Sequence, residues 1–281
     1  SSLFPTPEGQ AKARERLAEL GIEALVVVGG NGSLTGAHAL ASDRPCQVVG
    51  LPASIDNDLG HCGLAIGVDT AVNTIVEACD RISDTARAHR RAFLVEVMGR
   101  NCGFLALRAG IAAEADAILF GEVKKSEDEI VEQLRDVMQK AFGAGWYKQR
   151  ILIVKSEGVE VSTTRLVRRL QEHLEEDAPG VEIRETVLGH MVRGGRPSAM
   201  DRVIGQRLAY AAVLGLEKGI HDVMASWEAP MPVGMETMDP FIRLVPLAEV
   251  LEETSHLLDG TSPVVKKWIE LITSVEQLLV I

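Results

Sequence analysis

The 281-residue sequence has no long hydrophobic run, few cysteines and a shortage of basic residues. No stretch approaches the roughly 18 apolar residues that span a bilayer, and no secretory signal is visible, so we expect neither membrane insertion nor secretion. Lys and Arg number 29 against 40 Asp and Glu, for a net charge of -11. This balance weighs against nucleic acid as the main partner, although local arginine clusters can still hold phosphate on an acidic protein.

The four cysteines are too few and too scattered for a cysteine-based framework. Cys46, Cys62, Cys79 and Cys102 show neither CxxC spacing nor histidine pairing suited to zinc. We therefore expect them to be buried thiols in a reducing compartment, and a cytoplasmic location. The sequence also contains no internal repeat and no low-complexity tract.

Helical and strand patterns alternate along the chain. Amphipathic segments indicate helices, and short β-branched runs indicate buried parallel strands. The alternation is typical of βαβ units and of a mostly parallel, doubly wound sheet, an α/β fold class. The expected strands or extended segments are 24–28, 46–51, 92–97, 117–120, 150–155 and 182–189. The expected helices are 7–20, 69–88, 103–114, 126–141, 163–176, 199–217, 246–258 and 264–279. A further helix is expected to start near 34–41, and 228–242 is expected to be a loop.

Three polar motifs directly follow predicted strands: GGNGS (29–33), ASIDND (53–58) and MGRN (98–101). In parallel sheets, ligands bind beyond the carboxyl ends of the strands. Three such loops at one edge of a sheet would form one site.

The glycine-rich motif GGNGS exposes backbone N–H groups at a helix start, an environment that favours phosphate. No Walker lysine follows it, and a tight βα turn explains it equally well. In SIDND, one carboxylate of Asp56 and Asp58 can accept a proton while the other helps to hold a divalent cation. An Asx turn is the equal alternative for this pair.

The remaining motifs carry positive charge. Arg100, in MGRN, could stabilise a transferring phosphoryl group, or it could be an ordinary surface arginine. The stretch RETVLGHMVRGGRP (184–197) combines arginines, a histidine and a double glycine. That combination suits a sugar phosphate better than it suits a basic turn.

The four motifs occur in the same order as in the phosphofructokinase family, which the chain resembles from about residue 3 to 215. The family forms are GGDGS, PGTIDND, VEVMGRNCG and VLGHMVRGG. The resemblance implies one phosphofructokinase domain over 1–281, with two Rossmann-like lobes, mostly parallel sheets flanked by helices, and the active site in the cleft between the lobes. It assigns 1–67 plus 91–120 to a nucleotide and Mg²⁺ lobe, and 68–90 plus 121–281 to a sugar-phosphate lobe.

By the same resemblance, the chain transfers a phosphoryl group from MgATP to the 1-hydroxyl of fructose 6-phosphate. Asp56 then resembles the catalytic base and Asp58 the carboxylate associated with Mg²⁺. Ser54 stands where the family has threonine and keeps its hydroxyl. Arg100 resembles the arginine that stabilises the transferring group.

The resemblance also implies a sugar-phosphate site and a homo-oligomer, typically a tetramer. Arg91 and Arg184 would reach across an interface into a neighbour's site. The residues that match the family's substrate contacts are Arg91, Met98, Gly99, Glu157, Arg184, His190 and Arg193.

The nucleotide would bind at Gly30, Asn31, Gly32 and Ser33, with Asn31 also near the metal. Relatives that use pyrophosphate carry Asp and Lys where this chain has Gly32 and Ala53. Small residues at these two places leave room for a nucleotide, so the resemblance favours ATP.

Several positions depart from the family pattern. Asn31 replaces a second metal-associated aspartate, and an amide lacks the negative charge, so Mg²⁺ binding should weaken. Leu3 stands in place of a phosphate-contacting arginine. Ser83 replaces an effector-site arginine, although Asp116 and Lys148 are compatible with that effector site, so control by ADP or phosphoenolpyruvate is not expected to be retained intact.

The family normally carries about 70 further residues upstream, with a first strand and a Gly-rich loop, so the sheet would lose early strands and expose an edge. We therefore expect a fragment of a longer enzyme. The alternatives are a pyrophosphate-dependent or other sugar-phosphate kinase of the same family, and a non-catalytic, sugar-phosphate-binding paralogue.

Overall fold

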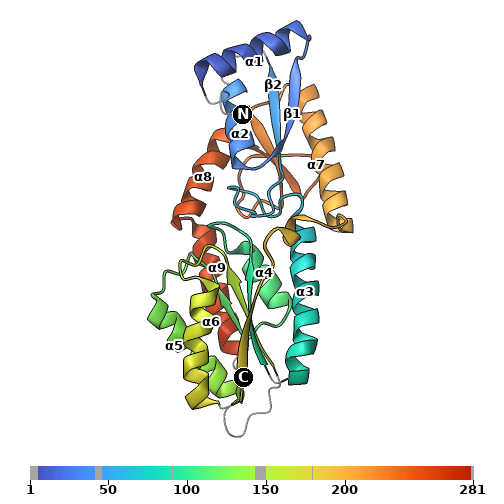
Figure 1. Ribbon diagram of the computed structural model, residues 1–281. Coiled ribbons are helices and arrows are strands. Elements are labelled where there is room, and N and C mark those ends of the chain that lie inside the picture. Colours follow the sequence, from blue (N-terminus) through green and yellow to red (C-terminus); the bar gives the residue numbers. More distant parts are fainter. Residues whose placement is uncertain (1–5, 42–45, 90, 143–149, 179, 280–281) are drawn as a thin grey trace. The chain divides into compact units, whose positions relative to one another are not determined.

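The computed structural model describes residues 6–41, 46–89, 91–142, 150–178 and 180–279 (Figure 1). Leu3 and Lys148 lie outside these residues. The chain divides into two units, each with its own sheet. The first unit comprises Ser1–Asp69 and Pro197–Ser262, and the second comprises Thr70–Arg196 and Pro263–Ile281. Within the described residues, no helix has the length and apolarity needed to cross a membrane.

The first unit holds a five-stranded sheet in the order β1-β2-β7-β9-β8. Strands β1, β2 and β7 are parallel, and β9 joins β7 and β8 in antiparallel pairs. The elements of this unit are α1 (Pro7–Glu19), β1 (Ala24–Gly29), α2 (Asn31–Ala41), β2 (Gln47–Pro52), α7 (Ala199–Glu217), β7 (Val223–Trp227), β8 (Met235–Glu236), β9 (Ile242–Pro246) and α8 (Leu247–Asp259).

Strands β1 and β2 pair along their whole length, so their carboxyl ends at Gly29 and Pro52 lie side by side. Helix α2 packs closely on β2 because Gly50 has no side chain: a Cβ there would lie 2.6 Å from a methyl group of Leu34. β1 is an edge strand, and Val28 on it is 59% exposed. The packing therefore fixes the two loops that follow β1 and β2 next to each other.

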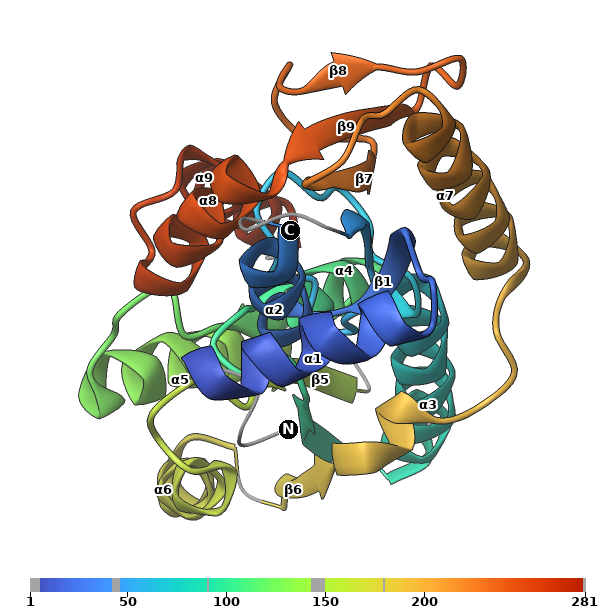
Figure 2. The same ribbon diagram turned by 90° about the horizontal axis from the view of Figure 1, so that it is seen from above.

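The second unit holds a parallel four-stranded sheet in the order β4-β5-β3-β6. Helices α5 and α6 pack on the face that carries Leu94 and Ile153, and Figure 2 shows both helices on one side of β5. The elements are α3 (Val68–His89, which begins at the boundary of the units), β3 (Arg91–Val97), α4 (Phe104–Ala112), β4 (Ala117–Leu119), α5 (Glu127–Phe142), β5 (Arg150–Ser156), α6 (Thr163–Asp177), β6 (Glu182–Val187), the 3-10 helix η1 (Gly189–Arg193) and α9 (Pro263–Leu279).

The predicted α/β class, the mostly parallel sheets and the order of the predicted helices and strands are confirmed. The sequence patterns did not predict β7, β8 and β9, and β9 begins within the expected loop 228–242. These strands are only two to five residues long, which is too short for a clear period.

The three motif loops do not follow strands of one sheet, contrary to the prediction. β3, which precedes MGRN, pairs with β5 and β6 in the second unit. The expected lobe boundaries differ from the observed units in the same way, because 91–120 lies in the second unit and 197–262 in the first. The residue pattern predicts which segments are strands, but the hydrogen-bonded pairing of the strands decides which of them are neighbours.

Candidate active site

The GGNGS motif forms the direct turn from β1 into α2. The carbonyl of Gly30 accepts from the N–H groups of Ser33 and Leu34, both at 3.0 Å. Gly29 is required here, because a Cβ would lie 2.5 Å from Ser33 Oγ. The N–H groups of Asn31 and Gly32 precede these first hydrogen bonds of α2, so the turn offers donors suited to an anion.

Asn31 and Gly32 are the first two residues of α2, and they differ in their contacts with neighbouring residues. The Thr35 hydroxyl donates to the backbone carbonyl of Asn31 at 2.9 Å and lies 3.4 Å from its side-chain oxygen. Gly32 is exposed, and a Cβ there would meet no atom within 4 Å. The fold therefore requires no glycine at position 32, unlike Gly29.

The carboxylate loop lies beside this turn in the same unit. Ala53 N–H donates to Gly29 O at 3.0 Å, and a Cβ on Gly30 would lie 3.4 Å from Ser54 Cβ. The expected phosphate turn and the expected acidic loop are therefore neighbours, as their place after paired parallel strands predicts.

Both carboxylates of the acidic loop are largely buried, with Asp56 at 5% and Asp58 at 8% exposure. Ser54 Oγ donates to Asp58 Oδ1 at 3.0 Å. Buried carboxylates are normally paired or bound to a cation. Among the residues that the structure describes, no group of three or more His, Cys, Asp or Glu could hold a metal by itself. A cation here would have one or two protein ligands, as Mg²⁺ often does beside nucleotide phosphates.

Asn57, between the two carboxylates, shapes this loop, a role that no local sequence pattern predicted. Its φ is 51°, a left-handed conformation that asparagine tolerates better than most residues. Its Nδ2 donates to Gly63 O at 3.2 Å, and its Oδ1 accepts from Ala65 N at 2.9 Å. The buried Asn57 side chain therefore ties the acidic loop to the chain that follows it.

In the second unit, the carboxyl ends of β5, β3 and β6 meet at one edge of the sheet. Glu157 N–H donates to Val97 O at 2.9 Å, and Leu188 N–H donates to Glu96 O at 3.0 Å. This edge brings together five predicted residues from three loops: Met98, Gly99, Glu157, His190 and Arg193.

Glu157 holds the loop that carries Arg100. Its Oε1 accepts from Gly99 N at 3.1 Å and from Arg100 N at 2.7 Å. Arg100 is exposed and has a left-handed φ of 51°. Gly99 has a φ of 145°, and a Cβ there would lie 2.4 Å from Cys102 O, so the position requires glycine. The two accepted hydrogen bonds offset the strain of a left-handed arginine.

An ion pair between buried Lys155 and half-buried Glu96 lies beneath this edge. Lys155, 1% exposed, donates to Glu96 Oε2 at 3.0 Å, and the Thr163 hydroxyl donates to the same oxygen. Burial alone would raise the pKa of Glu96, but the hydrogen bonds from Thr163 and Lys155 outweigh it and lower that pKa. The carboxyl ends of β3 and β5 are thereby joined by side chains as well as by the backbone.

Arg91 and Arg184 lie away from this edge. Arg91 pairs in register with Glu182 at the start of β3, seven residues or about 23 Å before Met98. Both arginines donate to Glu182 Oε2, Arg91 at 3.0 Å and Arg184 at 2.8 Å. The hydrogen bond from Arg184, and then its charge, lower the pKa of Glu182. In this unit, the two arginines therefore form a separate group from the five residues at the carboxyl edge.

Ser83 and Asp116, the two described residues at the positions of the family's effector site, are both buried within the fold. Ser83 is buried on α3. Asp116 is buried, and its Oδ2 accepts from Leu152 N at 2.8 Å. Asp116 thus anchors the start of β4 to β5.

Residues 1–216 match the phosphofructokinase family. This chain belongs to that family. It is 39% identical over 255 residues to the ATP-dependent 6-phosphofructokinase of Thermotoga neapolitana, covering 91% of this chain and 76% of the relative. It is 40% identical over 257 residues to ATP-dependent 6-phosphofructokinase 1 of Thermus thermophilus, covering 92% and 74%.

Solved structures of phosphofructokinases also resemble this chain. Phosphofructokinase of Pichia pastoris, in the T-state, superposes with a TM-score of 0.80 at 31% identity, over 96% of this chain and 31% of that chain. Phosphofructokinase of Saccharomyces cerevisiae gives 0.79 at 28% identity, over 97% and 39%. The chain thus spans less than two fifths of these yeast chains. A pyrophosphate-dependent phosphofructokinase of Marinobacter aquaeolei gives 0.68 at 21% identity, a likeness of fold alone.

Proposed function

We propose that the protein transfers the γ-phosphoryl group of ATP to the 1-hydroxyl of fructose 6-phosphate, giving fructose 1,6-bisphosphate and ADP. Membership of the family and relatives named ATP-dependent 6-phosphofructokinase support this reaction. The observation that carries it is the pairing of a helix amino terminus at Gly30 with the buried carboxylates Asp56 and Asp58 in one unit.

Asp56 is the proposed general base. It accepts the proton of the sugar 1-hydroxyl as that oxygen bonds to the γ-phosphorus, while the bond from phosphorus to the ADP oxygen breaks. Arg100 supplies positive charge to the phosphoryl oxygens in the transition state. Ser54 orients Asp58 through its hydrogen bond, and the helix start formed by Gly30, Asn31, Gly32 and Ser33 serves the nucleotide phosphates.

Asp58 and Asn31 fit a magnesium ion as far as their chemistry goes. Both offer oxygen ligands, one of them charged, and Mg²⁺ needs few protein ligands when phosphates and waters supply the rest. When bound, the ion neutralises charge on the phosphates of the nucleotide. Asn31 contributes no charge, so the protein should need a higher Mg²⁺ concentration than an aspartate-bearing relative.

ATP is the proposed donor because Gly32 and Ala53 leave space beside the turn. The fold has room for a side chain at position 32, and so does not itself require the glycine. The room is therefore available to a nucleotide. Activity with pyrophosphate and none with ATP would overturn this choice of donor.

Met98, Gly99, Glu157, His190 and Arg193 are the proposed sugar-phosphate contacts within one chain. Arg91 and Arg184 are proposed to serve a neighbouring chain in a homotetramer, which their distance along the strands from Met98 supports. Mixing two inactive variants, Asp56→Asn and Arg184→Ala, should then restore part of the turnover, because mixed assemblies contain sites with both residues intact. Absence of any recovery in confirmed mixed assemblies would contradict the shared site.

The decisive variant for the reaction is Asp56→Asn in the purified protein. We expect turnover with MgATP to fall by about 10³-fold or more while fructose 6-phosphate still binds, since the base acts mainly in the transition state. Asp84→Asn, an exposed residue of α3, is the matched control. Turnover close to that of the parent would sink the assignment. A parent that binds fructose 6-phosphate without turning over any donor would instead indicate a non-catalytic paralogue.

The cytoplasmic location stays a prediction from the sequence.

A further inference from the structure

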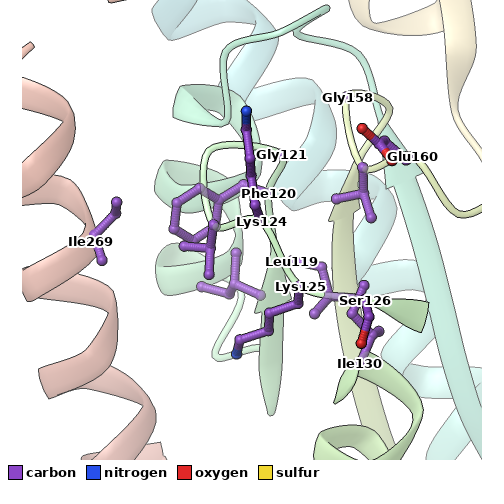
Figure 3. A pocket seen from close by; sticks show the side chains of 13 residues that line it. Leu119, Phe120, Gly121, Lys124, Lys125, Ser126, Ile130, Gly158, Glu160 and Ile269 are labelled. Carbon is purple, nitrogen blue, oxygen red and sulfur yellow. The ribbon is translucent and has the colours of Figure 1, made fainter. Parts of the chain in front are cut away.

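A cavity of about 420 Å³ lies in the second unit at the carboxyl end of β4. Its walls come from 118–121 and 123–126, from the β5–α6 turn at 158–160, from Ile130 of α5 and from Ile269 of α9. Figure 3 shows Ile269 facing Phe120 across it. Its volume falls within the roughly 300–1,000 Å³ of small-molecule pockets. Among the described residues that line it, none belongs to the proposed active site.

The floor of this cavity is apolar and its rim is mainly positive. Leu119, Ile130 and Val159 on the floor are buried. Lys124 and Lys125 lie exposed on the rim, and Figure 3 shows their ammonium groups extending to opposite sides of Phe120. Glu160 is the single carboxylate among the described lining residues. An excess of ammonium groups over an apolar floor suits an anion attached to a hydrocarbon or aromatic body.

The cavity wall packs directly against the Arg100 loop. A Cβ on Gly121, which lines the cavity, would lie 2.5 Å from Gly158 O, and a Cβ on Gly158 would lie 2.3 Å from Arg100 O. Three backbone segments are therefore stacked without side chains between them. Backbone packing through Gly158 therefore links the cavity wall at Gly121 to the loop that carries Arg100.

Two carboxylates reinforce this connection. Glu157, which precedes Gly158, accepts hydrogen bonds from the N–H groups of Gly99 and Arg100. Glu122, which follows Gly121, accepts from Gly103 N at 2.7 Å, and its burial raises its pKa. Both ends of the 99–103 loop are thus held by residues adjacent to glycines in the cavity wall.

We propose that this cavity is a regulatory site: it binds a small organic anion with an apolar body, and its occupancy restrains the Arg100 loop. The regulatory half rests on the proposed function, which gives Arg100 its role in the reaction. Because coupling between two sites is reciprocal, a substrate that orders the Arg100 loop must also tighten binding in the cavity.

Octanoate is the probe for binding, measured by titration calorimetry without any substrate. We expect saturable binding of one octanoate per chain, and binding of uncharged 1-octanol about tenfold weaker, since only the anion gains charge-assisted contacts. The double variant Lys124→Gln/Lys125→Gln should lose about tenfold in octanoate affinity and leave 1-octanol unchanged. Lys140→Gln, an exposed lysine in the last turn of α5, is the matched control and should bind as the parent does.

Ile269→Trp tests the place of binding, because the larger side chain fills the cavity and should abolish binding of both probes. If this variant does not fold, the lysine double variant decides alone, since both lysines are exposed. No saturable binding of octanoate, or equal affinity in the parent and the double variant, would overturn the site.

Amide hydrogen exchange tests the coupling without any assay of activity. Saturating octanoate should slow exchange at the N–H groups of Gly99 and Arg100, which Glu157 holds. Unchanged exchange at saturation would overturn the regulatory half. If octanoate binds and slows exchange while Asp56→Asn turns over normally, the cavity stands and the proposed reaction fails.

Discussion

Two loops, one in each unit, present the proposed reacting groups, and they are held in opposite ways. Asn57 in the first unit and Arg100 in the second share a left-handed φ of 51°. In the acidic loop, the side chain of the left-handed residue makes the anchoring hydrogen bonds and the neighbouring carboxylates are buried. In the MGRN loop, the backbone N–H groups are anchored by Glu157 and the side chain of Arg100 is exposed.

This difference follows from what each loop has to present. Asparagine tolerates the left-handed region, so the acidic loop gains bonds at little cost in strain. Arginine has no such preference, so the MGRN loop stores strain that two hydrogen bonds offset, and its Arg100 side chain is exposed. The first loop is therefore built for rigidity and the second for presenting a charge.

Removing the presented charge should have the largest effect. Arg100→Ala is expected to lower turnover by about 10³-fold, as loss of an arginine that stabilises a transferring phosphoryl group does elsewhere. Stability should stay close to that of the parent, because the side chain is exposed. Steady-state kinetics with MgATP and fructose 6-phosphate measure the effect, and Arg81→Ala, an exposed arginine of α3, is the control. A loss below tenfold would remove Arg100 from the chemistry.

Removing the anchoring side chain should instead destabilise the first unit. Asn57→Ala loses two buried hydrogen bonds and places alanine in a left-handed conformation, for a combined cost of about 3 kcal/mol. Urea denaturation measures the free energy of unfolding, with exposed Asn101→Ala as the control. A cost within the error of the Asn101 control would mean that other contacts hold the acidic loop.

Glycine at the two left-handed positions should separate the loops most clearly. Arg100→Gly is expected to stabilise the protein by about 1 kcal/mol, because it relieves strain and breaks no backbone hydrogen bond. Asn57→Gly should destabilise it, since glycine accepts the conformation but loses both side-chain bonds. The same urea titration compares the pair, and changes of equal sign would contradict the contrast drawn between the loops.

The smallest expected effect concerns Glu182, which neither loop contains. Its pKa is lowered in the folded protein, first by the hydrogen bond from Arg184 and then by that residue's charge. Ionised Glu182 therefore stabilises the fold above the ordinary glutamate pKa of about 4.3, and this small contribution is lost as the pH falls through the lowered pKa. Urea titrations of the parent and Glu182→Gln should differ slightly at pH 7 and converge in acid. A difference that grows in acid would reverse the assigned sign.

The sequence predicted the turns in which these loops lie better than the contacts that support them. Strand, glycine turn and helix signals predicted the GGNGS turn, whereas the roles of Asp56, Asp58 and Arg100 came from the family resemblance and stay predictions. The backbone acceptor role of Glu157 and the anchoring by Asn57 depend on contacts across loops, which no local pattern encodes. The assignment of β3 to the second sheet was missed for the same reason, since strand neighbours are set by long-range pairing.

The central claim, that Asp56 and Arg100 act in one transition state, is tested most directly by a double-mutant cycle on turnover. Asp56→Asn, Arg100→Ala and the double variant are compared with the parent under saturating MgATP and fructose 6-phosphate. Residues that act as a unit are strongly non-additive, so the double variant should be little slower than the slower single variant. A double variant whose loss equals the product of the two single losses would contradict the claim.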